Sequence, residues 1–244
     1  MKTRLDRWLV LLDRGSRKQV QALIRSGAVR VDGRVIRDPG EAAETETAQL
    51  TVMGEAVDGR VVRHVLMDKP AGLLTAARDP KQPTVMDLLP GVYSGTGCMP
   101  VGRLDKDTTG LLLLTTDGEM NHRLLSPGRH VEKRYRALAE GIMDREDIEL
   151  FARGIRLSDF EAQPARLEIL KTTGDTTLAE VVITEGRYHQ VKRMFAAAGH
   201  EVLQLHRRCF GPLELDPALP EGAWRELTAD EVGALRQAAG MERV

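Results

Sequence analysis

The sequence has few cysteines, few aromatic residues and no long apolar run. It contains two cysteines, Cys98 and Cys209, among 244 residues, and 4% aromatic residues. Two cysteines without metal-ligand spacing do not make a disulfide framework or a zinc site, so we expect buried free thiols and no metal. No stretch approaches the roughly 20 apolar residues of a membrane span, and the first residues lack the pattern of a secretory signal. We therefore expect a cytoplasmic protein without a membrane partner.

The chain also lacks a large net charge, but its charges are unevenly distributed. The formal net charge is −1 at pH 7. Residues 1–40 contain ten lysines and arginines against four acidic residues, a net +6, whereas residues 41–60 carry a net −4. A basic segment on a nearly neutral chain is typical of a docking module for a polyanion such as nucleic acid. Chance asymmetry over so short a segment is the simpler alternative.

The basic segment predicts two helices followed by a hairpin. Apolar residues at helical spacing predict a first helix over residues 4–13. Ser16 and Gln19 form a capping-box pattern that starts a second helix, and Gly27 is placed to end it in a left-handed turn. Residues 29–35, with Asp-Gly at their centre, predict a tight hairpin. The basic side chains that the apolar stripes leave exposed include Arg14, Arg17, Lys18, Arg25, Arg30 and Arg34.

This arrangement resembles the S-four-type (alpha-L) RNA-binding domain over about residues 3–50, most specifically in the stretch SRKQVQALIRSGAVRVDGRVI. The resemblance implies RNA docking, for which we select Arg14, Arg17, Lys18 and Arg25. The acidic run 41–49 and the stretch 54–59 are interpreted as a domain edge and linker. We therefore place an RNA-binding domain with its linker at residues 1–58 and a catalytic domain at residues 59–244.

From Val61 onward, strand-like runs and short helical segments follow one another without regular alternation, which favours an α+β domain over a doubly wound one. A capping-box pattern, Thr228 with Glu231, starts a final helix. The expected strands are 61–67, 111–115, 135–139, 165–170 and 178–184, and the expected helices between them include 119–125, 145–152 and 188–198.

The most informative stretch is the polar loop Gly102–Gly110, which leads directly into the apolar run Leu111–Leu114. Loops held by rigid core strands commonly carry catalytic groups. A solvated loop with a turn-forming aspartate is equally compatible with these residues alone. Asp105 and Asp107 would also share one face if they lay on a strand, which would suit a two-carboxylate hydrolase or a metal-dependent nuclease.

The loop resembles the catalytic motif of pseudouridine synthases, in which the aspartate after Arg-Leu is essential. Three further motifs of this family stand in the expected order: Lys69-Pro70-Ala71-Gly72, Lys133-Arg134-Tyr135 and the run 185–194, EGRYHQVKRM. The resemblance implies that Asp105 is the catalytic carboxylate, that Tyr135 stacks on the target base and that Lys192 pairs with Asp105. It also selects Arg103, Arg187 and Lys69 as RNA-contacting residues.

Helical periodicity around Lys192 is compatible with this assignment. Val191, Met194, Phe195 and Ala198 form one apolar stripe, which places Lys192 on the opposite face. Periodicity alone does not separate a solvated face from the wall of a site, and Tyr135 alone could equally be a core aromatic. The resemblance favours the site in both cases.

The family resemblance implies a mixed, mainly antiparallel sheet with a central cleft, and isomerisation of uridine without a cofactor. With the N-terminal domain, the motifs resemble the RsuA-like branch of rRNA pseudouridine synthases, and Tyr188-His189 with Lys192 favours its small-subunit enzymes. We expect a monomer that acts on 16S rRNA in an assembling small subunit. The alternatives are a 23S rRNA enzyme of the same family and a non-catalytic rRNA-binding assembly factor.

Overall fold

The computed structural model describes residues 2–242, whose contacts form two compact units. The first unit contains the residues up to His64 together with Met86–Met99 and Thr115–Asp117. The second unit contains Val65–Val85, Pro100–Leu114 and the residues from Gly118 onward. The domain boundary expected after residue 58 stays a prediction, because later segments of the chain also join the first unit. Within residues 2–242, no helix has the length and apolar character that crossing a bilayer requires.

The first unit consists of short helices and strands. They are β1 (Lys2–Arg4), α1 (Leu5–Leu11), α2 (Arg17–Arg25), β2 (Val29–Val31), β3 (Arg34–Ile36), β4 (Ala42–Glu44), β5 (Leu50–Val52), β6 (Glu55–Val57), most of the 3-10 helix η1 (Val85–Leu88) and α3 (Gly91–Gly95). One sheet has the order β3-β2-β5-β6, and β1 pairs separately with β4. The core between α1, α2 and the sheet includes Trp8, Leu9, Val20 and Ile24, all fully buried.

Local sequence signals placed the N-terminal elements correctly. The capping box at α2 is confirmed, since the Gln19 side chain accepts a hydrogen bond from the Ser16 N–H at 2.8 Å. Gly27 follows the helix with φ +82°, the left-handed conformation expected there. The hairpin is confirmed as β2 and β3, which pair from Val29↔Ile36 to Val31↔Arg34.

The interpretation of residues 41–49 and 54–59 as an edge and linker is wrong for much of this stretch. The chain forms β4 and β6 within these stretches, and β5, which lies between them, pairs with both β2 and β6. Leu50 and Val52 point into the core of the first unit while Thr51 between them is partly exposed. Two apolar residues in a polar stretch therefore suffice for a strand once a partner strand is present.

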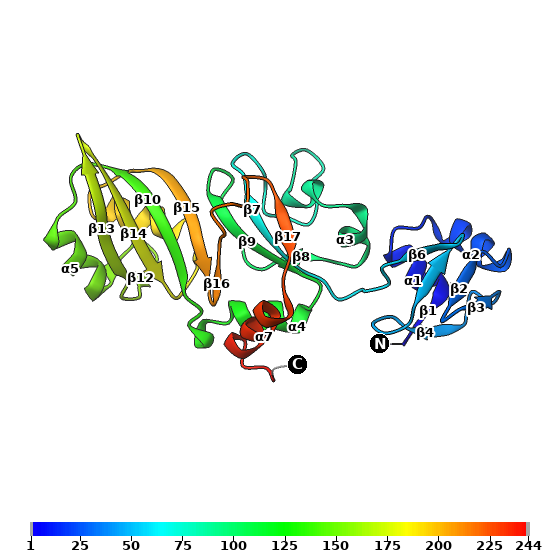
Figure 1. Cartoon of the computed structure of the whole chain (residues 1–244). Coiled ribbons are helices and arrows are strands. Elements are labelled where there is room, and N and C mark those ends of the chain that lie inside the picture. Colours follow the sequence, from blue (N-terminus) through cyan, green and yellow to red (C-terminus); the bar gives the residue numbers. More distant parts are fainter. Residues whose placement is uncertain (1, 243–244) are drawn as a thin grey trace. The chain divides into compact units, whose positions relative to one another are not determined.

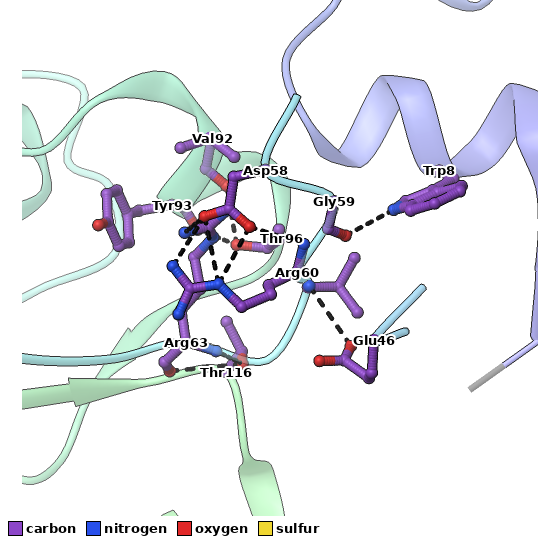
Figure 2. Close-up of polar contacts among 11 residues, drawn as sticks. Trp8, Glu46, Asp58, Gly59, Arg60, Arg63, Val92, Tyr93, Thr96 and Thr116 are labelled. Atoms are coloured by element: carbon purple, nitrogen blue, oxygen red, sulfur yellow. Dashed lines mark hydrogen bonds and ion pairs between the residues drawn. The ribbon is translucent and has the colours of Figure 1, made fainter. Parts of the chain in front are cut away.

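The segment after β6 is fixed within the first unit by polar contacts (Figure 2). The Trp8 indole N–H donates to the Gly59 carbonyl at 2.7 Å, and a Cβ on Gly59 would lie 2.5 Å from the Trp8 ring. Asp58 accepts from Arg60 at 2.8 Å and from Arg63 at 3.3 Å. These guanidinium groups, Arg60 foremost, lower the pKa of Asp58 to about 2. The connection therefore packs against the N-terminal core.

The second unit is built on one long sheet with the order β13-β14-β10-β15-β9-β7-β17, whose first four strands lie side by side in Figure 1. Its strands are β7 (His64–Lys69), β8 (Met99–Pro100), β9 (Thr109–Thr115), β10 (Lys133–Glu140), β11 (Ile155–Arg156), β12 (Glu161–Ala162), β13 (Arg166–Thr173), β14 (Thr176–Ile183), β15 (Val202–Phe210), β16 (Leu213–Glu214) and β17 (Trp224–Glu226). Its helices are α4 (Gly118–Leu125), η2 (Pro127–Arg129), α5 (Arg145–Arg153), α6 (Gln190–Ala197) and α7 (Ala229–Ala238).

The expected α+β class with a mainly antiparallel sheet is confirmed. β10 pairs antiparallel with β14 and β15, whereas β9 pairs parallel with β15. A core cluster joins β7 and β9 to α4 and α7 through apolar residues that include Leu66, Leu111, Leu113, Met120, Leu124 and Leu235. The expected strands appear as β7, β9, β10, β13 and β14, and the expected helices as α4, α5, α6 and α7.

The sequence analysis missed β15, a nine-residue strand in the middle of the sheet. Its sequence is VLQLHRRCF. Arg207 in this strand faces the interior and is only 2% exposed. A buried arginine breaks the alternation of apolar and polar residues by which a strand is recognised.

Gly110 allows β9 to approach β15. It has φ +101°, and a Cβ at this position would lie 2.3 Å from the Arg207 carbonyl oxygen. The two strands are in register there, at His206↔Thr109 and Arg207↔Gly110. A side chain on residue 110 would therefore force the two strands apart.

We predict that Gly110→Ala lowers the free energy of unfolding by about 2 kcal/mol or more, because a left-handed backbone and a backbone clash coincide. Urea unfolding of the variant measures the change. Gly118→Ala is the control, since Gly118 starts α4 with open space around its Cβ position, and it should unfold at the wild-type urea concentration or slightly above it. Equal midpoints for the two variants would contradict the role given to Gly110.

Candidate active site

Asp105 lies in the loop that leads into β9. The Thr108 N–H donates to the Asp105 carbonyl at 3.1 Å, so residues 105–108 form a tight turn. The strand that follows is buried along almost its whole length, which anchors the turn to the core. The Asp105 side chain is 27% exposed. The loop therefore presents a carboxylate whose backbone is held and whose oxygens remain accessible.

Lys69, at the end of β7, supports this loop from inside the protein. Its side chain is fully buried, and Nζ donates to the carbonyls of Pro70, Lys106 and Thr108 at 2.9, 3.3 and 2.9 Å. Burial lowers the pKa of Lys69 to about 8, while the charges of Asp107 and Asp105 act in the opposite direction. The expectation that Lys69 contacts RNA is therefore wrong, because its ammonium donors are directed at the loop carbonyls.

A cavity of about 450 Å³ adjoins Asp105 in the second unit. Its lining includes Arg103, Tyr135 and Arg187, so four of the residues selected from the sequence meet at one place. The volume lies within the range of roughly 300–1,000 Å³ that is usual for small-ligand sites. Tyr135 comes from β10 and is 8% exposed, so its ring belongs to the core and also forms part of the cavity wall.

The expectation that Lys192 pairs with Asp105 is wrong. The Lys192 ammonium, from α6, contacts both carboxylate oxygens of Asp107 at 2.7 and 2.6 Å, which lowers the pKa of Asp107. Residues 105–108 turn instead of extending as a strand, so the two carboxylates have different neighbours. The same turn removes the shared strand face on which the metal-dependent nuclease hypothesis depended.

His189 is a basic side chain in contact with Asp105. Its Nε2 lies 3.4 Å from Asp105 Oδ1, and the Tyr188 ring stacks on the imidazole at a centroid distance of 3.8 Å. His189 precedes α6 with φ +48°, a left-handed conformation that turns the chain into the helix. The buried stripe expected on this helix is confirmed for Val191, Met194 and Phe195.

Arg103 and Arg187 are exposed at the cavity. The Arg187 guanidinium lies 4.4 Å from the centre of the Phe160 ring, and its Nε is 3.8 Å from a Glu185 carboxylate oxygen. Both arginines are placed where a polyanion entering the cavity would meet them.

Two further cations line the cavity, and the sequence analysis gave neither of them a role. Lys133 and Arg207 are 8% and 2% exposed. Burial, followed by the charge of Arg207, lowers the pKa of Lys133 to about 8. Lys133 had a usable signal, because it stands two residues before Tyr135 on one strand and so shares its face. Arg207 had no such signal, because no strand was expected over the residues of β15.

The basic residues selected in the N-terminal segment are all on the surface of the first unit. Arg14, Arg17, Lys18 and Arg25 are exposed. The Arg17 guanidinium approaches the buried Asp6 carboxylate at 3.5 Å. The unit therefore presents a basic surface on α2 and the residues before it.

Comparison with protein families gives two matches. Residues 63–197 match the RNA pseudouridylate synthase family, and residues 3–46 match the S4 domain family. The first match spans more than half of the chain and contains Asp105, Tyr135 and Lys192.

Several curated relatives match over nearly their whole length. An uncharacterized RNA pseudouridine synthase, YtzG, of Bacillus subtilis is 43% identical over 96% of this chain and 98% of its own. The ribosomal small subunit pseudouridine synthase A of Pseudomonas aeruginosa is 41% identical over 94% and 98%. The ribosomal large subunit pseudouridine synthase B of Bacillus subtilis is 38% identical over 92% and 91%.

A solved structure described as a pseudouridylate synthase matches with a TM-score of 0.66 and 34% identity, covering 95% of this chain and 99% of that one. The family models, the relatives and the solved structure agree. The chain therefore belongs to the RNA pseudouridylate synthase family of isomerases and carries an S4 domain at its N-terminal end.

Proposed function

We propose that this protein isomerises a specific uridine of 16S rRNA to pseudouridine, with Asp105 as the catalytic carboxylate. The observation that carries the proposal is the cavity that Asp105 shares with Tyr135 and Arg103. The family supplies the reaction class, and the similarity to an enzyme named for the ribosomal small subunit supplies the substrate class.

The reaction accounts for the residue types in the cavity. Uridine becomes pseudouridine when the bond from N1 to C1′ breaks, the uracil turns, and C5 bonds to C1′. No atom is gained or lost overall, so the balance requires no redox partner. A carboxylate such as Asp105 can act at the sugar as a nucleophile or as a base. Its partial exposure leaves the oxygens open to a substrate.

The target base must leave its stack before Asp105 can reach the sugar. Enzymes that act on a base inside RNA or DNA extrude it into a pocket, at a cost of about a few kcal/mol. Stacking on an aromatic ring returns on the order of 1–3 kcal/mol. Tyr135 and Tyr188 both line the cavity with Asp105, and Tyr135 is the one that belongs to the Lys133-Arg134-Tyr135 motif. Arg103, exposed on the same loop as Asp105, would fill the vacated space or hold the backbone.

Lys192 has an indirect role in this proposal. By neutralising Asp107, it removes a second negative charge two residues from Asp105. An uncompensated carboxylate at Asp107 would place a second negative charge on the loop and repel the RNA backbone. The catalytic importance expected of Lys192 is therefore electrostatic support of the loop.

The S4 domain docks the RNA through the exposed side chains of Arg14, Arg17, Lys18 and Arg25. Each can neutralise a phosphate, and such contacts position RNA without reading its sequence. An enzyme with one docking domain and one catalytic site can act as a monomer in the cytoplasm, with ribosomal RNA of an assembling small subunit as its partner.

The rRNA substrate has two candidates, because the relatives include small-subunit and large-subunit enzymes. In the motif at residues 185–194, Tyr188 and His189 follow Gly-Arg, and Lys192 comes after them. These residues favour the small subunit. A binding role without catalysis is disfavoured, because it would leave the cavity at Asp105 without a use.

Asp105→Asn should abolish pseudouridine formation, with a loss of more than about 10³-fold in the single-turnover rate, because the amide is neither nucleophile nor base. RNA affinity should stay near the wild-type value. Quantitative pseudouridine assay of 16S transcripts measures the rate, and Asp107→Asn is the matched control, expected to lose less. Full activity of Asp105→Asn would disprove the assignment.

Tyr135→Leu should lower kcat/KM by about 5- to 150-fold, corresponding to loss of the 1–3 kcal/mol of stacking. Tyr135→Phe keeps the ring and should lose far less. Thermal unfolding of both variants separates this effect from loss of core packing. Equal losses in the two variants would show that the hydroxyl, not the ring face, is the important group.

Mapping of pseudouridines in rRNA from cells that lack the gene should reveal the loss of a 16S site. Complementation by the wild-type gene, but not by the Asp105→Asn gene, should restore it. Loss of a 23S site alone would refute the small-subunit assignment while leaving the reaction intact, and unchanged rRNA would refute both.

A further inference from the structure

Lys133 and Arg207 form a pair of buried cations on neighbouring strands. Lys133 and Tyr135 lie on the same face of β10, and β15 places Arg207 opposite Tyr135 and Phe210 opposite Lys133. All four side chains line the cavity that contains Asp105. The pair therefore lies next to the ring expected to stack on the target base.

Neither cation is neutralised within the protein. Across residues 2–242, no carboxylate lies within ion-pair distance of Lys133 or Arg207, and Arg207 Nη2 is buried without a hydrogen-bond partner. The other contacts are with carbonyls: Arg207 Nε donates to Leu111 at 2.7 Å, and Lys133 Nζ to Thr184 at 3.3 Å.

Glu185, which with Asp105 supplies carboxylates to the cavity lining, is hydrogen-bonded elsewhere. Glu185 lines the same cavity, but its Oε1 accepts hydrogen bonds from the Gln163 N–H at 2.8 Å and from Gln190 Nε2 at 2.6 Å. Its Oε2 faces Arg187. Glu185 is therefore hydrogen-bonded to groups other than the two buried cations, and its charge only partly opposes the lowering of the Lys133 pKa by burial.

Two unpaired buried cations are costly, since each loses its hydration without gaining a counterion. The aromatic rings compensate only in part: the Arg207 guanidinium lies 5.3 Å from the Phe210 ring centre and 6.0 Å from that of Tyr135, and Lys133 Nζ lies 5.7 Å from Phe210. A protein retains such an arrangement where negative charge develops during a reaction.

We propose that Lys133 and Arg207 bind the oxygens of the extruded uracil and stabilise the uracil anion formed when its bond to the sugar breaks. This inference rests on the proposed function. As the bond from N1 to C1′ breaks, its electron pair passes to the ring and spreads from N1 onto O2 and O4. After the ring turns, C5 bonds to C1′, the proton on C5 leaves, and N1 gains a proton, so the atoms balance.

Negative charge reaches the uracil oxygens on each of the chemical routes open to Asp105. Attack of Asp105 at C1′ and removal of a sugar proton both release the base as an anion. Addition of Asp105 to C6 of the uracil ring places negative charge on O4 before the bond to the sugar breaks. Because the cations adjoin the base-stacking residue, they would stabilise this negative charge on every one of these routes and do not select among them.

The test uses Lys133→Met and Arg207→Met in the full-length protein, with Arg208→Met as the control. Arg208 is the next residue on β15 and contacts Glu214 at 4.0 Å, and it does not line the cavity. Lys133→Met should fold normally, since replacing a buried unpaired charge by an apolar side chain removes a desolvation cost. Three quantities are measured: single-turnover rate at saturating enzyme, Kd for rRNA, and the dependence of Kd on salt.

We expect the single-turnover rate to fall by about 10²-fold or more in each cavity variant, the usual effect of removing one donor to a developing anion. Kd and its salt dependence should stay close to the wild-type values, and Arg208→Met should behave as wild type. If Arg207→Met fails to fold, the single-turnover rate of Lys133→Met is sufficient to test the inference.

Two outcomes would overturn the inference. One is an undiminished rate in folded Lys133→Met. The other is a weaker dependence of Kd on salt. A decrease of about 0.7 in the slope of log Kd against log salt for each removed charge would identify a backbone phosphate as the ligand. A wild-type protein that forms no pseudouridine in any rRNA would refute the proposed function as well, whereas an active wild type with equally active variants would refute only this inference.

Discussion

The contact between β9 and β15 at Gly110 and Arg207 determines where the functional groups of the second unit meet. β15 pairs with β10 on one side and with β9 on the other, so it joins the strand that carries Tyr135 to the strand that follows Asp105. The approach is possible because residue 110 has no side chain. A residue with Cβ at this position would separate the carboxylate from the ring that lines the same cavity.

Charge in the second unit is arranged around this contact in two different ways. Near the loop, charges are compensated: Lys192 pairs with Asp107, and the ammonium of Lys69 is enclosed by carbonyls. At the strands, Lys133 and Arg207 have no counterion within ion-pair distance among residues 2–242. Lys192, Asp107 and Lys69 hold the loop that carries Asp105. Lys133 and Arg207 place positive charge at the wall of the cavity. This suits a reaction in which a neutral base departs with an electron pair.

The local signals in the sequence were reliable where a single residue type dictates a backbone conformation or a cap. Ser16 with Gln19, Gly27 and the Asp-Gly turn gave the N-terminal helices and hairpin, and the polar loop before an apolar strand gave the position of Asp105. They failed for β5 and β15. Both strands are stabilised by neighbours on two sides, and such pairing over long sequence distances leaves little trace in the pattern of either strand.

The sequence by itself determined the class of fold, the family resemblance and the choice of Asp105 and Tyr135, because these follow from residue types in fixed local order. Only the tertiary structure decided which charges meet. It assigned Lys192 to Asp107, turned Lys69 into a buried support and brought Arg207 beside Lys133, since ion pairs and burial depend on strands and loops that are distant in the chain.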